Sequence, residues 1–128
     1  MRNTIAQERS AFALNEVKNL GQNPKEFGKL VAGLPAMILQ NGFGQSLAFL
    51  LAKGTDKHGR FEESNKHLKA FDIIARWLVK RTMLPNGDRE KVVITLSELP
   101  QEDYLQAQEE ALKVLEWVKR YANAGLFS

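Results

Sequence analysis

The chain has 128 residues, a hydrophobic fraction of 44% and a net charge of +3, which together fit one globular domain spanning residues 1–128. Because it has no cysteine, disulfides, thiolate nucleophiles and zinc–thiolate sites are excluded. The small basic excess is compatible with an anionic partner, and the opening segment MRNTIAQERS lacks the apolar core of a signal peptide.

A first helix is predicted over residues 4–20. Asn3 or Thr4 can cap its start, because a side-chain oxygen there accepts a hydrogen bond from a free amide of the first turn, and Gly21 can end it. Apolar residues recur at near-helical spacing and give this helix a packing face. They are Ile5, Phe12, Ala13, Val17 and Leu20.

A second helix is predicted over residues 24–40. Asn23 followed by Pro24 is typical of a helix start, since proline is tolerated at the first helical position. Pro35 lies further inside and has no amide hydrogen to donate to the helix ladder. We therefore expect the helix to bend or to restart at Pro35.

The stretch from residue 30 to residue 52 carries no formal charge and has the length of a membrane span. Its centre, residues 40–46, is polar, and polar groups at a bilayer centre are costly. Two buried helices joined by a turn at Asn41-Gly42 therefore explain the stretch better than a span. The later of the two, residues 43–53, is apolar on most sides and is expected to lie in the core. Its apolar residues are Phe43, Leu47, Ala48, Phe49, Leu50 and Leu51.

Residues 54–63 contain polar side chains and two glycines, so they are predicted to form a loop. Ser64 or Asn65 can then cap a fourth helix that runs to about Met83. The sequence LPNGD, residues 84–88, is a further turn signal.

The segment EKVVITL, residues 90–96, is rich in β-branched residues, which favour a strand locally. A lone strand would have no partner, so a short helix or an extended linker is expected instead. A last helix is predicted over residues 100–124, ending at Gly125. The predicted fold is all-α, a compact single-domain bundle of five or six helices.

The titratable residues do not predict an active site. Neither His58 nor His67 has a partner at metal-ligand spacing, so both are expected at the surface. Acid–base chemistry would need carboxylates held in a desolvated pocket, whereas solvated helix faces are the expected location of the glutamates. The candidates are Glu8, Glu62, Glu63, Glu109 and Glu110. We therefore expect no catalytic residue, no metal site and no cofactor.

The fourth helix carries cations along one narrow arc, at about 100° per residue. They are Lys66, Lys69, Arg76 and Lys80. Its apolar residues lie roughly opposite and are Leu68, Phe71, Ile74, Ala75 and Leu78. Such a row of cations could follow the phosphate backbone of a nucleic acid. An ordinary solvated helix face would have the same pattern, and both interpretations stay open.

The last helix places Trp117 at the edge of an apolar face, between Lys113 and Arg120. The residues of this face are Ala107, Ala111, Val114, Val118 and Tyr121. A tryptophan between two cations could stack on a base while the cations hold phosphates. It could equally reach into the core with the cations at its border.

Three stretches resemble a known family. They are QERSAFALNEV (7–17), LPAMILQNGFGQSLAFLLAK (34–53) and QEEALKVLEWVKRYA (108–122). Together they are similar to the small subunit of the type III-B CRISPR RNA-guided effector, the Cmr complex. The central stretch is the most specific, because it combines a leucine-proline pair, an asparagine-glycine turn and an apolar helix that ends in lysine.

The resemblance implies an all-α, non-catalytic structural subunit that takes part in antiviral defence in the cytoplasm. Its implied partners are the backbone subunits, the large polymerase-like subunit, further copies of itself, guide RNA and target RNA, with no membrane. Copies would line the path of the guide–target duplex, where base pairing reads sequence and protein supplies shape and charge. Trp117 lies in a matching motif, so we expect its edge beside Arg120 at a subunit contact.

Two alternatives remain at this point. The chain could be the small subunit of another multisubunit CRISPR effector, which would share the helical bundle and the basic face. It could instead be a small-molecule-binding helical regulator that uses the apolar centre as a pocket.

Overall fold

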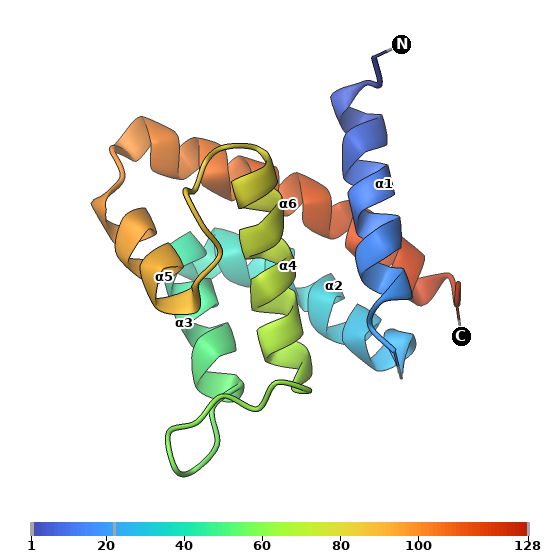
Figure 1. The fold of residues 1–128 in the computed structure, drawn as a ribbon, viewed down its shortest axis with the longest axis horizontal. Coiled ribbons are helices and arrows are strands. Elements are labelled where there is room, and N and C mark those ends of the chain that lie inside the picture. The colour runs from blue at the N-terminus through green and yellow to red at the C-terminus, as the bar shows by residue number, and fades with distance from the viewer. Residues whose placement is uncertain (1, 22, 128) are drawn as a thin grey trace.

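The computed structural model describes residues 2–21 and 23–127 (Figure 1). Within these ranges it contains six helices and no strand beyond an isolated bridge between Thr55 and Phe61. The helices are α1 (Ile5–Lys18), α2 (Pro24–Asn41), α3 (Phe43–Lys53), α4 (Lys66–Lys80), α5 (Arg89–Glu98) and α6 (Gln101–Asn123). The prediction of a compact all-α bundle of five or six helices is confirmed.

The longest helix, α6, extends across the molecule and packs mainly against α2 and α1, with α4 as a further neighbour (Figure 1). α2 runs antiparallel to it, because Gly28 lies against Asn123 while the start of α3 contacts Tyr104. The core fills the space between these helices. Its largest fully buried side chains are Trp77, Phe43, Phe71, Leu34, Ile38 and Leu50.

Local side-chain chemistry sets several helix ends. Thr4 caps α1 in a reciprocal capping box with Gln7, and Asn65 caps α4 by accepting the amide of His67 at 2.7 Å. α4 ends at Lys80 rather than near Met83. Thr82 adopts a left-handed conformation with φ of 59°, and the Met83 amide donates to the Leu78 carbonyl at 2.8 Å, which closes the helix in a Schellman motif.

The uncharged central stretch forms the corner between α2 and α3. α2 continues through Pro35, so the helix does not restart there. Gly42 alone joins the two helices, with φ of 93° and ψ of 156°, a conformation that a side chain would strain. No helix in the described part of the chain is both long and apolar enough to cross a membrane.

The expectation that α3 lies in the core is confirmed for one face of the helix. Only one face is buried, with Phe43, Leu47 and Leu50 pointing inward, while Phe49 is half-buried and Ala48 is exposed. The physical reason is the position of α3 at the margin of the bundle, where α2, α4 and α5 cover part of its circumference.

The β-branched segment at residues 90–96 is helical and belongs to α5. Asp88 caps the helix by accepting the Lys91 amide at 3.3 Å, and Val92 and Leu96 share a buried face at a spacing of one turn. Packing against α3 and α4 therefore overrides the local strand preference.

Two glycine-to-alanine changes should shift stability in opposite directions. Gly33 lies inside α2 with nothing within 4 Å of where a Cβ would stand, so Gly33→Ala should stabilise the fold by about 0.5–1 kcal/mol. A Cβ on Gly54, at the end of α3, would overlap the buried Leu68 side chain, so Gly54→Ala should cost about 1–3 kcal/mol. Urea unfolding measures both changes. A Gly54→Ala variant as stable as wild type would show that Leu68 moves aside freely.

Candidate functional site

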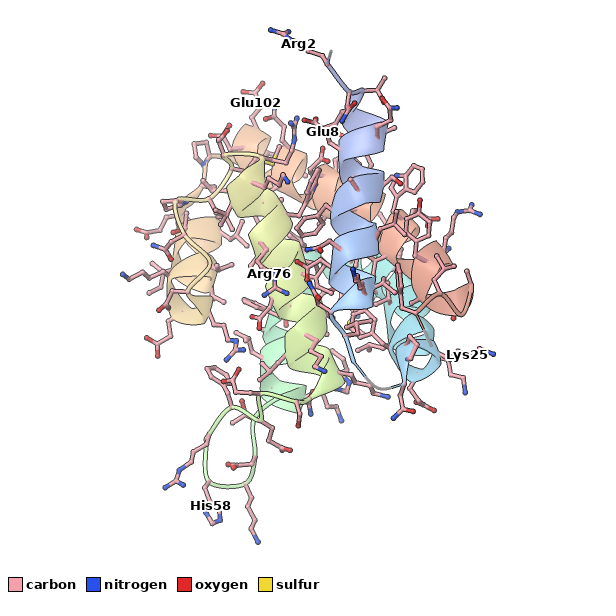
Figure 2. All side chains as sticks on the ribbon, turned by 45° about the vertical axis from the view of Figure 1, so that its right-hand side comes forward. Arg2, Glu8, Lys25, His58, Arg76 and Glu102 are labelled. Carbon is pink, nitrogen blue, oxygen red and sulfur yellow. The ribbon has the colours of Figure 1, made fainter. Side chains whose placement is uncertain are left out.

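α4 is buried around most of its circumference and turns a narrow basic strip outward, on which Arg76 is visible in Figure 2. We call Lys66, Lys69, Arg76 and Lys80 the α4 strip. All five apolar residues predicted opposite the strip are buried, as expected. The buried face also includes Ala70, Ile73 and Trp77, which the sequence analysis did not single out.

Three of the four strip cations contact neighbouring elements. Lys66 Nζ lies 3.5 Å from a carboxylate oxygen of Glu26 in α2. Lys69 Nζ donates to the carbonyl oxygen of Leu20 at 3.0 Å. Lys80 is exposed at the end of the helix.

Arg76 has the tightest contacts of the strip. Its Nε and one terminal nitrogen donate to the two carboxylate oxygens of Glu16 in α1, at 2.9 and 2.7 Å. This paired bonding raises the pKa of Arg76 against the opposing effect of burial. Arg76 therefore anchors α1 to α4 while about half of its side chain, 53%, remains exposed.

The residues singled out on α6 lie at the border of the core. Trp117 is half-buried and packs against the core, with its ring centroid 5.8 Å from that of Tyr121. Tyr121 shares a hydrogen bond of 2.6 Å with the hydroxyl of Ser10 in α1. Lys113 pairs with Glu109 at 3.1 Å one turn earlier, and Arg120 is exposed.

A buried polar cluster links α1, α4 and α6. The Arg9 guanidinium donates to both carboxylate oxygens of Glu110, at 2.6 and 3.1 Å, and Trp77 Nε1 donates to the same group at 2.9 Å. Arg81 adds a nearby positive charge, and its buried Nε has no hydrogen-bond partner in the described part of the chain. The ring of Phe12 covers Trp77 at a centroid distance of 5.0 Å.

The expectation that Glu110 is solvated is wrong, since only 6% of the residue is exposed. Glu8, Glu62, Glu63 and Glu109 are exposed. A signal for the difference was present in the sequence. At about 100° per residue Glu110 points to the edge of the apolar face of α6, between the directions of Tyr121 and Trp117, where a charge needs a buried partner.

Opposing effects act on the pKa of Glu110. Burial raises it, whereas hydrogen bonds from Arg9 and Trp77 and the charges of Arg9 and Arg81 lower it and prevail. The carboxylate is thus held in its ionised form. A charge that is so fully paired holds helices together, and it offers no free carboxylate for acid–base chemistry.

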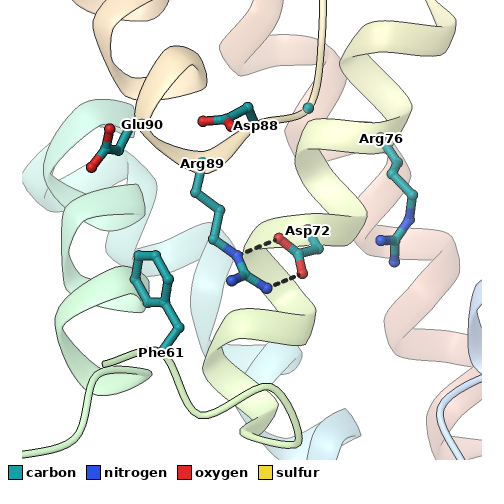
Figure 3. Close-up of a pocket in the computed structure, with 7 residues that line it drawn as sticks. Phe61, Asp72, Arg76, Asp88, Arg89 and Glu90 are labelled. Atoms are coloured by element: carbon teal, nitrogen blue, oxygen red, sulfur yellow. Dashed lines mark hydrogen bonds and ion pairs between the residues drawn. The ribbon is translucent and has the colours of Figure 1, made fainter. Parts of the chain in front are cut away.

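A second cluster surrounds Arg89 at the start of α5, beside a hollow of about 500 Å³ (Figure 3). Arg89 donates to Asp72 at 3.0 and 2.8 Å and to Glu63 at 3.0 and 2.7 Å. Its Cζ lies 4.8 Å from the ring centroid of Phe61. The hydrogen bonds from Arg89 lower the pKa of Glu63. No sequence motif joins these residues, because they come from three separate segments, the loop before α4, α4 itself and α5.

The histidines do not form a metal site. His58 is exposed in the loop before α4, while His67 is half-buried, with its ring centroid 5.9 Å from that of Phe49. Burial, Lys66 and Lys53 lower the pKa of His67. Among the residues that the structure describes, no group of three or more potential metal ligands comes together.

Truncating Glu110 should destabilise the fold far more than truncating its neighbour Glu109. Glu110→Ala leaves Arg9 and the Trp77 indole without a buried acceptor, so we expect a loss of about 3–5 kcal/mol. Glu109→Ala is the matched control, since its ion pair with Lys113 is exposed and should contribute about 0.5 kcal/mol or less. Urea unfolding at neutral pH compares them.

The same carboxylate should contribute to the pH dependence of stability. Its pKa is lower in the folded state than the ordinary 4.5, so its contribution is full above that value and is lost as the pH falls through the folded pKa. Glu110→Gln should therefore lose less stability than wild type on acidification. Parallel losses in the two proteins would contradict this assignment.

Comparison with known proteins places this geometry in a family. The profile of the family described as CRISPR-associated protein (Cas_Cmr5) matches residues 5–125. The fold is similar to that in an X-ray crystal structure of a CRISPR-associated Cmr5 family protein from Thermus thermophilus, with a TM-score of 0.71 and 25% sequence identity. The similarity covers 95% of this chain and 97% of that chain. The resemblance found in the sequence is confirmed, and the chain belongs to the Cas_Cmr5 family of CRISPR-associated proteins.

Proposed function

We propose that this chain is a non-catalytic structural subunit of a type III-B Cmr ribonucleoprotein, which acts in antiviral defence in the cytoplasm. The observation that carries the proposal is the family match over residues 5–125. The two buried carboxylates, Glu16 and Glu110, support it, because each binds an arginine of another helix and thereby stabilises the scaffold. Family membership favours this role over a small-molecule-binding regulator.

In this proposal the α4 strip faces the path of the guide–target duplex. Lys80 is exposed at one end of the strip, and the exposed portions of Lys66 and Arg76 lie along the same helix. Phosphate contacts of this kind give affinity without reading sequence. The internal bonds of Lys69 and Arg76 fix the positions of these side chains before RNA binds.

The half-buried Trp117, with Lys113 and Arg120, is the proposed contact with another effector subunit or with a further copy of this chain. Its geometry suits an interface anchor, because a half-buried indole supported by Tyr121 presents a rigid apolar edge beside an exposed arginine.

Removing the outer strip cations should weaken RNA binding without unfolding the chain. The double variant Lys66→Ala/Lys80→Ala leaves the Arg76–Glu16 pair in place, which a change of all four cations would not. We expect lower affinity for unrelated RNA sequences alike and a weaker dependence on salt. The matched control Lys91→Ala/Lys119→Ala removes the same charge from α5 and α6. Equal RNA affinities for the two double variants would show that the α4 strip is an ordinary solvated helix face.

Arg120→Ala should fold normally and assemble poorly into the effector. An exposed arginine contributes little to folding, so we expect a stability change within about 0.5 kcal/mol. Trp117→Ala should cost less than about 3 kcal/mol, because only part of the indole is buried, and should also reduce assembly. Co-purification with the other effector subunits measures incorporation, with Lys119→Ala as the control. Full assembly of the Arg120→Ala chain would leave Trp117 as a core residue only.

A further inference from the structure

The segment that joins α3 to α4, residues 54–65, is an ordered projection, and we call it the finger. It extends away from the helices, with His58 at its outer end (Figures 1 and 2). Thr55 and Phe61 form a bridge across it, the Asp56 amide donates to the Arg60 carbonyl at 2.8 Å, and the Glu62 amide donates to the Gly54 carbonyl at 2.8 Å. Its two arms are therefore hydrogen-bonded to each other.

The tip of the finger is shaped by Asp56. Its Oδ1 accepts the backbone amides of His58 at 2.8 Å and Arg60 at 3.0 Å, and Gly59 makes the turn with φ of 78°. The side chains of Lys57 and Arg60 are exposed on this turn. A protruding loop whose backbone is already ordered loses less conformational entropy when it binds a partner.

The base of the finger is fastened by Arg89. Its guanidinium donates to Asp72 of α4 and lies over the ring of Phe61 (Figure 3). The same group also donates to Glu63 of the finger. The Arg89 side chain is only 16% exposed, whereas its partner in the finger, Glu63, is 72% exposed, so the link from α5 to the finger is buried at its α5 end. Arg89 thus adds a side-chain link to the two side-chain hydrogen bonds that join the finger to α3, from Thr55 Oγ1 to the Leu51 carbonyl and from Asn65 Nδ2 to the Lys53 carbonyl.

Cations lie both at the tip and at the base of the finger. Lys53 and Lys66 flank the base, where Asn65 Nδ2 donates to the Lys53 carbonyl at 3.2 Å, and both cations act on His67. The tip, residues 57–60, presents Lys57, Arg60 and backbone but no large apolar side chain of the kind that anchors a protein interface. The adjacent Phe61 is 41% exposed and its ring lies against the Arg89 guanidinium, while the exposed Glu63 on the same arm is paired with Arg89. Cations spaced along a protrusion match successive phosphates.

We propose that the finger contacts the phosphate backbone of RNA through Lys57 and Arg60, and that Arg89 holds it in the binding orientation. The proposal rests on the proposed function, which brings RNA to this subunit, and assigns to the finger a contact separate from the α4 strip. Arg89 acts as a positioning residue, since its own charge is paired with Glu63 and Asp72.

The test measures binding of a fluorescein-labelled oligouridine to the full chain by anisotropy at several salt concentrations. Lys57→Ala/Arg60→Ala should lower affinity about tenfold at low salt. It should also reduce the salt slope by about 1.4, since each contact with single-stranded nucleic acid contributes about 0.7. Unchanged affinity and slope, or no measurable binding by wild type, would overturn the finger as an RNA contact.

The positioning role of Arg89 can be tested by the rate of trypsin cleavage in the finger, which the loss of a positive charge alone should not change. Arg89→Ala should speed trypsin cleavage after Lys57 and Arg60 and lower RNA affinity, whereas Lys91→Ala, on the same helix, should leave cleavage unchanged. Phe61→Ala loosens the same base and serves if Arg89→Ala does not fold. Faster cleavage with unaltered affinity would overturn the positioning role.

Co-purification with the other effector subunits distinguishes an error in the assignment of the finger from an error in the proposed function. Normal incorporation of the Lys57→Ala/Arg60→Ala chain into the effector, together with unaltered RNA binding, would overturn the finger and leave the proposed function standing. Failure of the wild-type chain to co-purify with the other effector subunits would overturn the proposed function itself.

Discussion

The fold depends on the need to neutralise one carboxylate, that of Glu110, inside the core. A buried charge is tolerated only when it is paired and hydrogen-bonded, and here α1 and α4 supply the partners through Arg9 and Trp77. α1 buries few side chains of its own, so polar contacts decide where it sits. Ser10 with Tyr121 and Glu16 with Arg76 repeat the arrangement at other points along the helix. Directional bonds fix the register of α1 more tightly than an apolar face alone would.

The same arrangement connects the scaffold to the surface. Arg76 belongs to the α4 strip and also closes the joint between α1 and α4, so one side chain contributes to stability and to the basic face. Lys69 makes a similar link, because it donates to the carbonyl of Leu20, two residues after the end of α1. A subunit of a multisubunit complex gains from such double use of one side chain, because its surface charges keep fixed positions while partners are added around them.

The features that could be predicted from the sequence are those that local side-chain chemistry controls, such as the starts of helices. The starts at Thr4, Asn65 and Pro24 follow from caps and proline, whose effect is confined to about one turn. The extent to which α3 is buried could not be predicted from the sequence, since it depends on which other helices pack against α3. The contacts of the site residues were also out of reach. Arg76 and Glu16 are 60 residues apart, and one helix period gives the direction of a side chain but not its partner.

The connection between α2 and α3 also bears on the order in which the chain folds. A single residue, Gly42, closes this corner, so the two helices meet at almost no cost in loop entropy. The partners of α1 are distant by comparison, because Arg9 and Ser10 bind residues of α6 that lie 101 and 111 positions later. During synthesis the α2–α3 corner can form as it leaves the ribosome, whereas α1 waits until α6 has been made. Half of the α1 residues are polar and three of its apolar residues are alanines, which limits the apolar surface that is in contact with water during that interval.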